Sequence, residues 1–212
     1  MKIGIIGAGG KSGRHLVAEA LRQGYDVTAI VRDKKKIADL PVPSIERDVF
    51  SITPEDAAGF AAVINAFKAP EGEEEQHVSS MDHLIAVFGQ LPDVRLLVVG
   101  GAGSLYTNEA RMERLMDSKN FPPAFLPTAS NMGVAFERLK GSKVDWTYFS
   151  PAAMYDPGGK RTGKYTLGGD VMITNRAGES YVSYADYAIA MIDELASKAH
   201  LRRRFTVVSE RE

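Results

Sequence analysis

The sequence predicts an α/β protein with a doubly wound, mainly parallel sheet flanked by helices. Short β-branched apolar runs alternate with amphipathic segments along almost the whole chain, as in strand–helix–strand units. The run VRLLVVGG, at 94–101, is apolar nearly throughout, which is typical of a strand buried on both faces. No repeat, low-complexity stretch or linker divides the chain, so we expect one domain over 1–212.

The first half of the chain is expected to hold five strands and four helices. KIGII is a β-branched run that ends at glycine, and apolar residues between 16 and 21 share one face of the following helix. Thr53 and Pro54 favour a helix start, and four glutamates between 71 and 75 suit the first turn of a helix. The expected strands are 2–6, 26–31, 44–49, 61–67 and 94–101, and the expected helices are 11–23, 34–40, 52–60 and 71–91.

The second half continues the alternation with two interruptions. We expect a core position for Trp146, and we expect Asp186 to cap or orient the last helix. Segments 102–127 and 151–183 break the pattern, so a substrate pocket beyond the C-terminal strand ends would be built from them. The expected helices are 128–142 and 184–197, and the expected strands are 144–151, 203–209 and two short ones near 164–167 and 180–183.

Composition excludes several classes of function. The formal net charge of −1 gives no general attraction to nucleic acid or to an acidic membrane. The basic stretch HLRRRF, at 200–205, is expected to be a solvated junction between a helix and a strand. The absence of cysteine excludes disulfides and fits a cytoplasmic location, and the four histidines lack metal-ligand spacing. We therefore expect no metal, and no membrane or nucleic-acid partner.

A glycine-rich turn follows the first expected strand. Gly7, Gly10 and Gly13 have the spacing Gly-x-x-Gly-x-x-Gly, within a strand–helix–strand unit of about 30 residues. Gly7 would form the turn, Gly10 would let the backbone approach a pyrophosphate, and Gly13 would let the helix pack close to the sheet. Free N–H groups at the helix start, at Lys11 and Ser12, would face the anion. Gly9 has no assigned role.

The end of the second expected strand bears on the choice of dinucleotide. An acid about 20 residues beyond the glycines usually binds the ribose 2′-hydroxyl of NAD, whereas an arginine accommodates a 2′-phosphate. Here Arg32 occupies that place, with Asp33 next and three lysines behind it. We expect NADP(H) to be preferred, and Asp33 leaves NAD(H) open as the alternative. Further cofactor contacts are expected at the ends of the third and fourth strands, at Asp48, Val49, Asn65, Ala66 and Phe67.

The glycine spacing and the 1–50 region resemble atypical short-chain dehydrogenases/reductases, a family with a Rossmann-like NAD(P)-binding fold. That family includes NAD(P)H:flavin reductases, biliverdin-IXβ reductase and NADP-sensing regulators. The likeness extends over nearly the whole chain through HVSSMDHLIAV, RLLVVGGAGSL, DWTYFSPAAMYDPG and SYVSYADYAIAMIDEL. These segments are similar to bacterial proteins described as NADH-flavin reductases or as epimerase/dehydratase-like.

The chain departs from the family at its usual catalytic pair, Tyr-x-x-x-Lys. None of the eight tyrosines has a lysine four residues later. Epimerase chemistry needs a positioned base, whereas transfer of hydride to a flavin or a quinone mainly needs contact between donor and acceptor. The sequence therefore favours an NAD(P)H-dependent reductase of a planar small molecule, with Ser104 and Tyr155 as candidates near the reacting atoms. The alternative is a non-catalytic NADP(H)-binding sensor. Nothing in the sequence indicates the oligomeric state.

Overall fold

The computed structural model describes residues 1–212 and contains an eight-stranded sheet in the order β3-β2-β1-β4-β5-β6-β10-β8. All neighbouring strands are parallel except β8, which runs antiparallel to β10. The order reverses between β1 and β4, which is where doubly wound sheets bind ligands. The strands are β1 (Lys2–Ile6), β2 (Asp26–Val31), β3 (Ser44–Glu46), β4 (Ala62–Asn65), β5 (Arg95–Val99), β6 (Trp146–Ser150), β8 (Tyr165–Gly168) and β10 (Arg203–Ser209).

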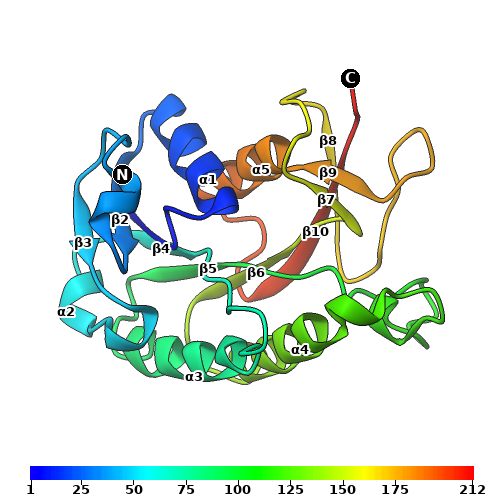
Figure 1. Ribbon diagram of the computed structural model, residues 1–212, viewed down its shortest axis with the longest axis horizontal. Helices are drawn as coiled ribbons and strands as arrows, with labels where there is room; N and C mark the ends of the chain where they lie inside the picture. The colour runs from blue at the N-terminus through cyan, green and yellow to red at the C-terminus, as the bar shows by residue number, and fades with distance from the viewer.

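Helices cover both faces of this sheet, as the sequence predicts (Figure 1). On one face α1 (Lys11–Arg22) packs beside α5 (Tyr184–Ser197), and on the other α3 (Gln76–Phe88) packs beside α4 (Leu126–Lys140). The one-turn helix α2 (Pro54–Ala57) begins with a capping box formed by Thr53 and Asp56. Four short 3₁₀ segments complete the set: η1 (Lys34–Ile37), η2 (Val49–Ser51), η3 (Leu115–Asp117) and η4 (Pro123–Phe125).

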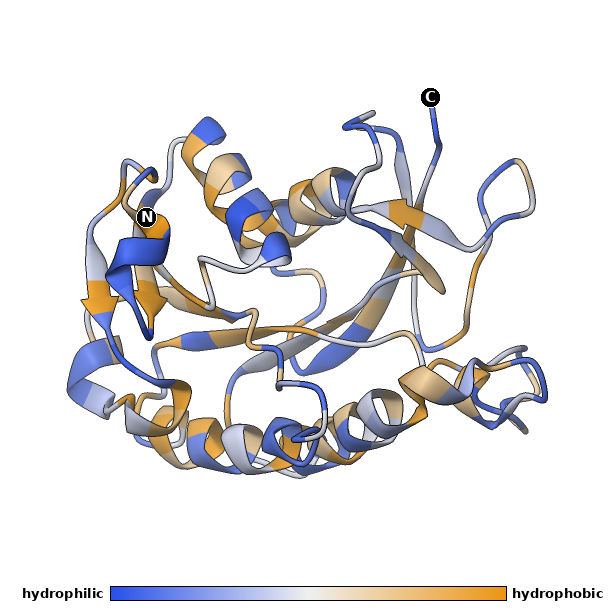
Figure 2. Cartoon of the chain, viewed as in Figure 1, coloured by the Kyte–Doolittle hydropathy of each residue, from blue (hydrophilic) through white to orange (hydrophobic).

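Each face of the sheet has its own apolar core. Under α1 and α5, Phe149 is stacked between Tyr187 and Phe205, with ring centroids 4.2 and 3.9 Å away. Under α3 and α4, Trp146 and Tyr148 are buried, which confirms the expectation for Trp146. Figure 2 shows hydrophobic residues concentrated on the strands and on the sides of the helices that face them.

The acidic run 71–75 does not lie in the first turn of a helix, contrary to the prediction. Gly72 has a left-handed backbone (φ 84°), and α3 begins only at Gln76. The carboxylate of Glu74 accepts a hydrogen bond from the Gly72 N–H, at 3.0 Å. The acids therefore form a turn that leads into α3, because local side chain–backbone hydrogen bonds compete with helix formation there.

Two predicted helices are shorter than expected, and one short strand was not predicted. Where helices 34–40 and 52–60 were expected, the structure has only the single turns η1 and α2. A three-residue strand, β7 (Met154–Asp156), was not predicted; it pairs in parallel with β9 (Tyr181–Ser183) as a separate two-stranded sheet. Asp186 does not cap α5. Ser183 caps it, and the Asp186 carboxylate instead accepts three hydrogen bonds from Thr162 and Gly163.

Candidate functional site

The glycine turn between β1 and α1 has backbone geometry that only glycine accommodates. Gly7 has a left-handed backbone (φ 73°), and a Cβ there would lie 2.7 Å from the carbonyl oxygen of Ala66. A Cβ on Gly13 would lie 2.8 Å from the Ala8 Cα and closer still to the Gly7 carbonyl oxygen. Gly9 approaches Ile37 of η1, where a Cβ would lie 3.2 Å from the side chain. This contact gives Gly9 a packing role that the sequence did not reveal.

The start of α1 presents unpaired backbone donors. Gly10 is the N-cap, and no protein group accepts a hydrogen bond from the N–H groups of Lys11, Ser12 or Gly13. The adjoining first turn carries no acidic residue. Together with the helix dipole, these free N–H groups form a suitable site for the pyrophosphate of a dinucleotide.

A cleft of about 280 Å³ lies beside this turn at the C-terminal ends of β1, β2 and β4; we call it the cofactor groove. Apolar walls come from Ile6, Ile30, Val31 and Val49. Four cations line it against a single acid, Asp33, so the groove favours an anionic ligand. The complete lining is Ile6, Gly7, Gly9, Gly10, Ile30, Val31, Arg32, Asp33, Lys36, Arg47, Val49, Ala66, Phe67 and Lys68.

The acids near Arg32 already have other partners. The Asp33 carboxylate accepts from the Lys35 N–H at 2.9 Å and thereby caps η1. The Asp48 carboxylate accepts from the Phe50 N–H at 3.0 Å, and one of its oxygens lies 3.9 Å from the Arg32 Nε. The Arg32 side chain is 67% exposed, and Arg32 is one of the residues that line the groove. Asp48 is absent from the lining, whereas Val49 belongs to it.

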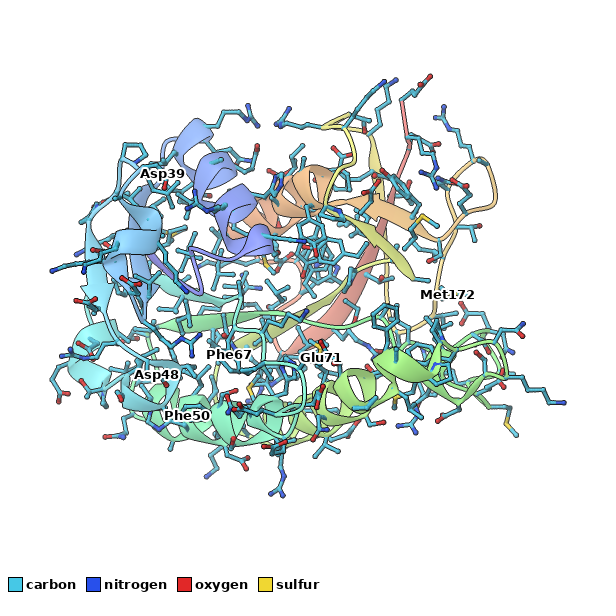
Figure 3. All side chains as sticks on the ribbon, in the orientation of Figure 1. Asp39, Asp48, Phe50, Phe67, Glu71 and Met172 are labelled. Atoms are coloured by element: carbon cyan, nitrogen blue, oxygen red, sulfur yellow. The ribbon has the colours of Figure 1, made fainter.

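The end of β4 shapes the groove through its backbone. The buried Asn65 side chain accepts a hydrogen bond from the Phe67 N–H at 3.0 Å, so it orders the turn and does not line the groove. Ala66 and Phe67 do line it. The Phe67 ring meets Phe50 edge to face at 6.2 Å, and Figure 3 shows both residues on the same side of the molecule as Asp48. The predicted positions at this strand end therefore divide into one supporting residue and two lining residues.

A second, mainly apolar pocket of about 420 Å³ lies at the C-terminal ends of β5 and β6; we call it the acceptor pocket. Segments 101–103, 115–132 and 151–155 build it, which is where the sequence predicts substrate contacts. Phe125 at this pocket is 64% exposed. Because β4 and β5 are neighbours in the sheet, the strand ends at the acceptor pocket follow directly on those at the cofactor groove.

Tyr155 links the acceptor pocket to the start of α1. Its hydroxyl forms a 2.8 Å hydrogen bond with the Ser12 hydroxyl at the start of α1, and its ring packs against Tyr184 and Tyr187. Burial raises the pKa of Tyr155 well above its usual value, and the hydrogen bond to Ser12 only partly offsets this. Tyr155 therefore stays protonated at neutral pH and forms a fixed wall of the acceptor pocket.

Ser104 lies outside both the cofactor groove and the acceptor pocket. Its hydroxyl and its carbonyl both accept from the Arg204 guanidinium at 3.0 Å, and it lines a different cavity. A role for Ser104 near the nicotinamide stays a prediction without a supporting contact.

Sequence reasoning missed Arg14, Arg47 and Lys68. Arg14 donates to the carbonyls of Gly9 and Lys36 and pairs with Asp39, so it ties the glycine turn to η1. The signal for Arg14 was a cation one turn into the helix after the glycines. Arg47 and Lys68 come to the groove from strand ends that are distant in sequence, and no local motif marks them.

The structure contains neither a metal-binding cluster nor a membrane-spanning helix. No group of three or more histidine, cysteine or acidic side chains is arranged to hold a metal ion. None of the helices combines the length and the apolar character needed to cross a membrane.

Comparison with known proteins places the chain in a family. A family model described as NAD(P)H-binding matches residues 7–198. The uncharacterized protein YwnB of Bacillus subtilis is 52% identical over 213 residues, which covers 100% of both chains. A crystal structure from Streptococcus pneumoniae, of a candidate NADH-flavin reductase, matches with a TM-score of 0.94 and 38% identity over 99% of this chain and 100% of that one. A candidate epimerase from Bacteroides thetaiotaomicron matches with a TM-score of 0.86 and 38% identity over 100% of this chain and 98% of that one. The chain belongs to the NAD(P)H-binding family.

Proposed function

We propose that the chain is an NADPH-dependent reductase of a flat apolar molecule such as a flavin or a quinone. The acceptor pocket carries this proposal, because it is mainly apolar, has a volume of about 420 Å³ and lies at the next strand ends along the sheet from the cofactor groove. Such a volume and lining are typical of small-molecule sites. The name of the Streptococcus pneumoniae relative, a candidate NADH-flavin reductase, supports the same class of acceptor.

The chemistry requires little from the protein beyond placement. Bound NADPH would supply a hydride, and a proton from water would complete the two-electron reduction of the acceptor. The task of the protein is to hold donor and acceptor in contact, which residues at the ends of β5 and β6 would do from the acceptor side. No Tyr-x-x-x-Lys pair is present to act as a base on a substrate hydroxyl, which disfavours the epimerase reaction.

Tyr155 is proposed to position the acceptor. With its pKa raised by burial, its hydroxyl is a weak acid and a poor source of a proton at neutral pH. Its ring is held by Tyr184 and Tyr187, and its hydroxyl by Ser12, so its orientation is well defined. A fixed aromatic wall suits contact with a planar ring system.

Arg32 is proposed to make the protein prefer NADP(H) over NAD(H). Arg32 lines the groove, and the Asp33 carboxylate that could bind a ribose 2′-hydroxyl is engaged with the Lys35 N–H. Arg32→Ala is expected to weaken NADPH binding about tenfold and to leave NADH binding unchanged, since one charge-assisted phosphate contact is lost. Lys35→Ala is the matched control, because Lys35 is an exposed cation two residues away from Asp33 that does not line the groove. An unchanged NADPH/NADH ratio in Arg32→Ala would remove Arg32 from this role.

The reaction itself is tested by steady-state oxidation of NADPH and NADH with a panel of flavins, quinones and carbonyl compounds. Oxidation that depends on an added flavin or quinone supports the reductase. Tight NADPH binding with no turnover against any acceptor would refute it and favour an NADP(H) sensor. Turnover of carbonyl compounds alone would assign a different substrate class to the acceptor pocket.

A further inference from the structure

We propose that a third cavity, on the α4 side of the sheet, binds a small anion that carries several phosphate groups. This cavity, which we call the basic cavity, measures about 890 Å³ and lies between α4, the start of β10, the end of β8 and the loop 104–114. It shares no lining residue with the cofactor groove or with the acceptor pocket. Anion binding in the basic cavity is therefore independent of the proposed reductase activity.

The charge of its lining sets the basic cavity apart. Six arginines and lysines line it against two carboxylates, and a third carboxylate, Asp117, pairs with Arg114 from outside the lining, which leaves an excess of three positive charges in a chain whose net charge is −1. Like charges gathered around a concave surface reinforce one another and attract anions. The six cations are Arg111, Arg114, Lys140, Arg202, Arg203 and Arg204.

A buried arginine, held by hydrogen bonds, forms the floor of the basic cavity. The Arg204 side chain is only 4% exposed; its Nε donates to Asp170 at 2.7 Å, and its Nη1 donates to the Ser104 carbonyl and hydroxyl. The guanidinium also lies over the Phe136 ring, 4.8 Å from its centroid. The stretch HLRRRF is therefore not a solvated junction throughout, contrary to the prediction, because its last arginine, Arg204, is buried.

The cations at the rim are only partly neutralised. Lys140 pairs with Glu137, Arg114 pairs with Asp117 at 2.7 Å, and Arg111 lies 3.7 Å from Asp170, which Arg204 already engages. Arg202 and Arg203 have no carboxylate partner. Arg202 donates to the Ser142 carbonyl at 2.9 Å, and the Arg203 side chain makes no hydrogen bond within the protein. Forked guanidinium groups bind phosphate oxygens in pairs, so two arginines without a carboxylate partner, Arg202 and Arg203, beside Arg204 suit a ligand with adjacent phosphates.

Glycines leave this space open. Gly169 has no atom within 4 Å of the position that a Cβ would occupy, and Gly133 allows α4 to approach Ser104 and Met116. The cavity volume lies in the range typical of sites for small organic ligands and exceeds what a single inorganic ion needs. Its ligand is thus either an inorganic polyphosphate or a nucleotide polyphosphate, which share the same anionic chemistry.

Isothermal titration calorimetry with tripolyphosphate tests the assignment, with ATP and citrate in parallel titrations. We expect binding of tripolyphosphate or ATP that Arg203→Glu weakens at least about tenfold, because a charge-assisted contact is replaced by repulsion. Tighter binding of ATP would identify a nucleotide, and equal binding would identify the phosphate chain alone as the ligand. Citrate binding as tight as that of tripolyphosphate would overturn the phosphate assignment.

Three variants locate the binding. Arg176→Glu reverses the charge of an exposed arginine outside the basic cavity and is expected to bind like the unaltered chain. Equal weakening by Arg176→Glu and Arg203→Glu would show nonspecific attraction and overturn the proposal. Weakening by Arg32→Glu alone would place the anion in the cofactor groove and also overturn it. If circular dichroism shows that Arg203→Glu is unfolded, Arg111→Asn replaces it, since Asn tolerates the left-handed backbone of Arg111 (φ 54°).

Discussion

Replacement of Gly13 by alanine tests the reasoning about the glycine turn most directly. The added Cβ would lie 2.8 Å from the Ala8 Cα, which is 0.6 Å short of the 3.4 Å at which ordinary contacts begin. Both neighbours, Ala8 Cα and the Gly7 carbonyl, are backbone, so neither can move aside as a flexible side chain could. The turn that carries Gly10 must therefore shift by at least this amount relative to α1.

Such a shift affects binding more than folding. Overpacking of this kind costs about 1–3 kcal/mol of stability. A displacement approaching 1 Å at a ligand-positioning segment can cost about 100-fold in function, so NADPH affinity is expected to fall by about that factor. Gly59→Ala is the control, because a Cβ there meets nothing within 4 Å and the backbone is not left-handed.

NADPH fluorescence titrations of both variants, with thermal melts to confirm folding, provide the measurement. Gly13→Ala should remain folded at 25 °C and bind NADPH far more weakly than Gly59→Ala. If Gly13→Ala binds NADPH within about threefold of the unaltered chain, a shift of the turn does not control binding and the argument from close packing fails.

Three further changes test other parts of the structure. Tyr155→Phe is expected to lower kcat less than about tenfold without altering its pH profile, whereas a proton donor would lose about 100-fold or more and refute the positioning role. Glu19→Gln tests a buried carboxylate: burial alone would raise the pKa of Glu19, but hydrogen bonds from two arginines and a glutamine outweigh it and lower the pKa to about 2. Its contribution to stability is therefore present above pH 4.5 and lost as the pH falls toward 2, so the deficit in Tm of the variant at pH 7 should vanish on acidification; a pH-independent deficit would contradict this. Arg95→Leu leaves the buried Glu194 without its guanidinium partner and should lower the free energy of unfolding in urea by about 3–5 kcal/mol. The double variant Arg95→Leu with Glu194→Leu should lose less stability, because no unpaired charge remains buried. A greater loss in the double variant would show that the ion pair is not responsible.

The sequence predicted the doubly wound sheet because its signals are local. Each parallel strand is an apolar run closed by turn residues, and the glycine turn needs backbone conformations that few other residues adopt. The same local signals placed Gly7, Arg32, Val49 and Phe67 on the cofactor groove.

The predictions that failed concern residues whose partners are distant in the sequence. The strand β7 has only three residues, too few for a periodic pattern, and its partner β9 lies 25 residues later in the sequence. Asp186 was expected at a helix cap, but its carboxylate is engaged by a loop that precedes it by more than 20 residues. The burial of Arg204 depends on Asp170 and Ser104, which no local motif around the arginine run reveals.

The cofactor groove and the acceptor pocket come from separate stretches of the chain. The groove uses residues between 6 and 68, and the acceptor pocket uses residues between 101 and 155. A chimera that receives segment 101–155 from a relative would therefore inherit the acceptor range of the donor protein while keeping the host preference between NADPH and NADH. The Ser12–Tyr155 hydrogen bond is the contact with α1 that such a graft must preserve, beside those that Ser104, Thr147 and Phe149 make with the rest of the chain.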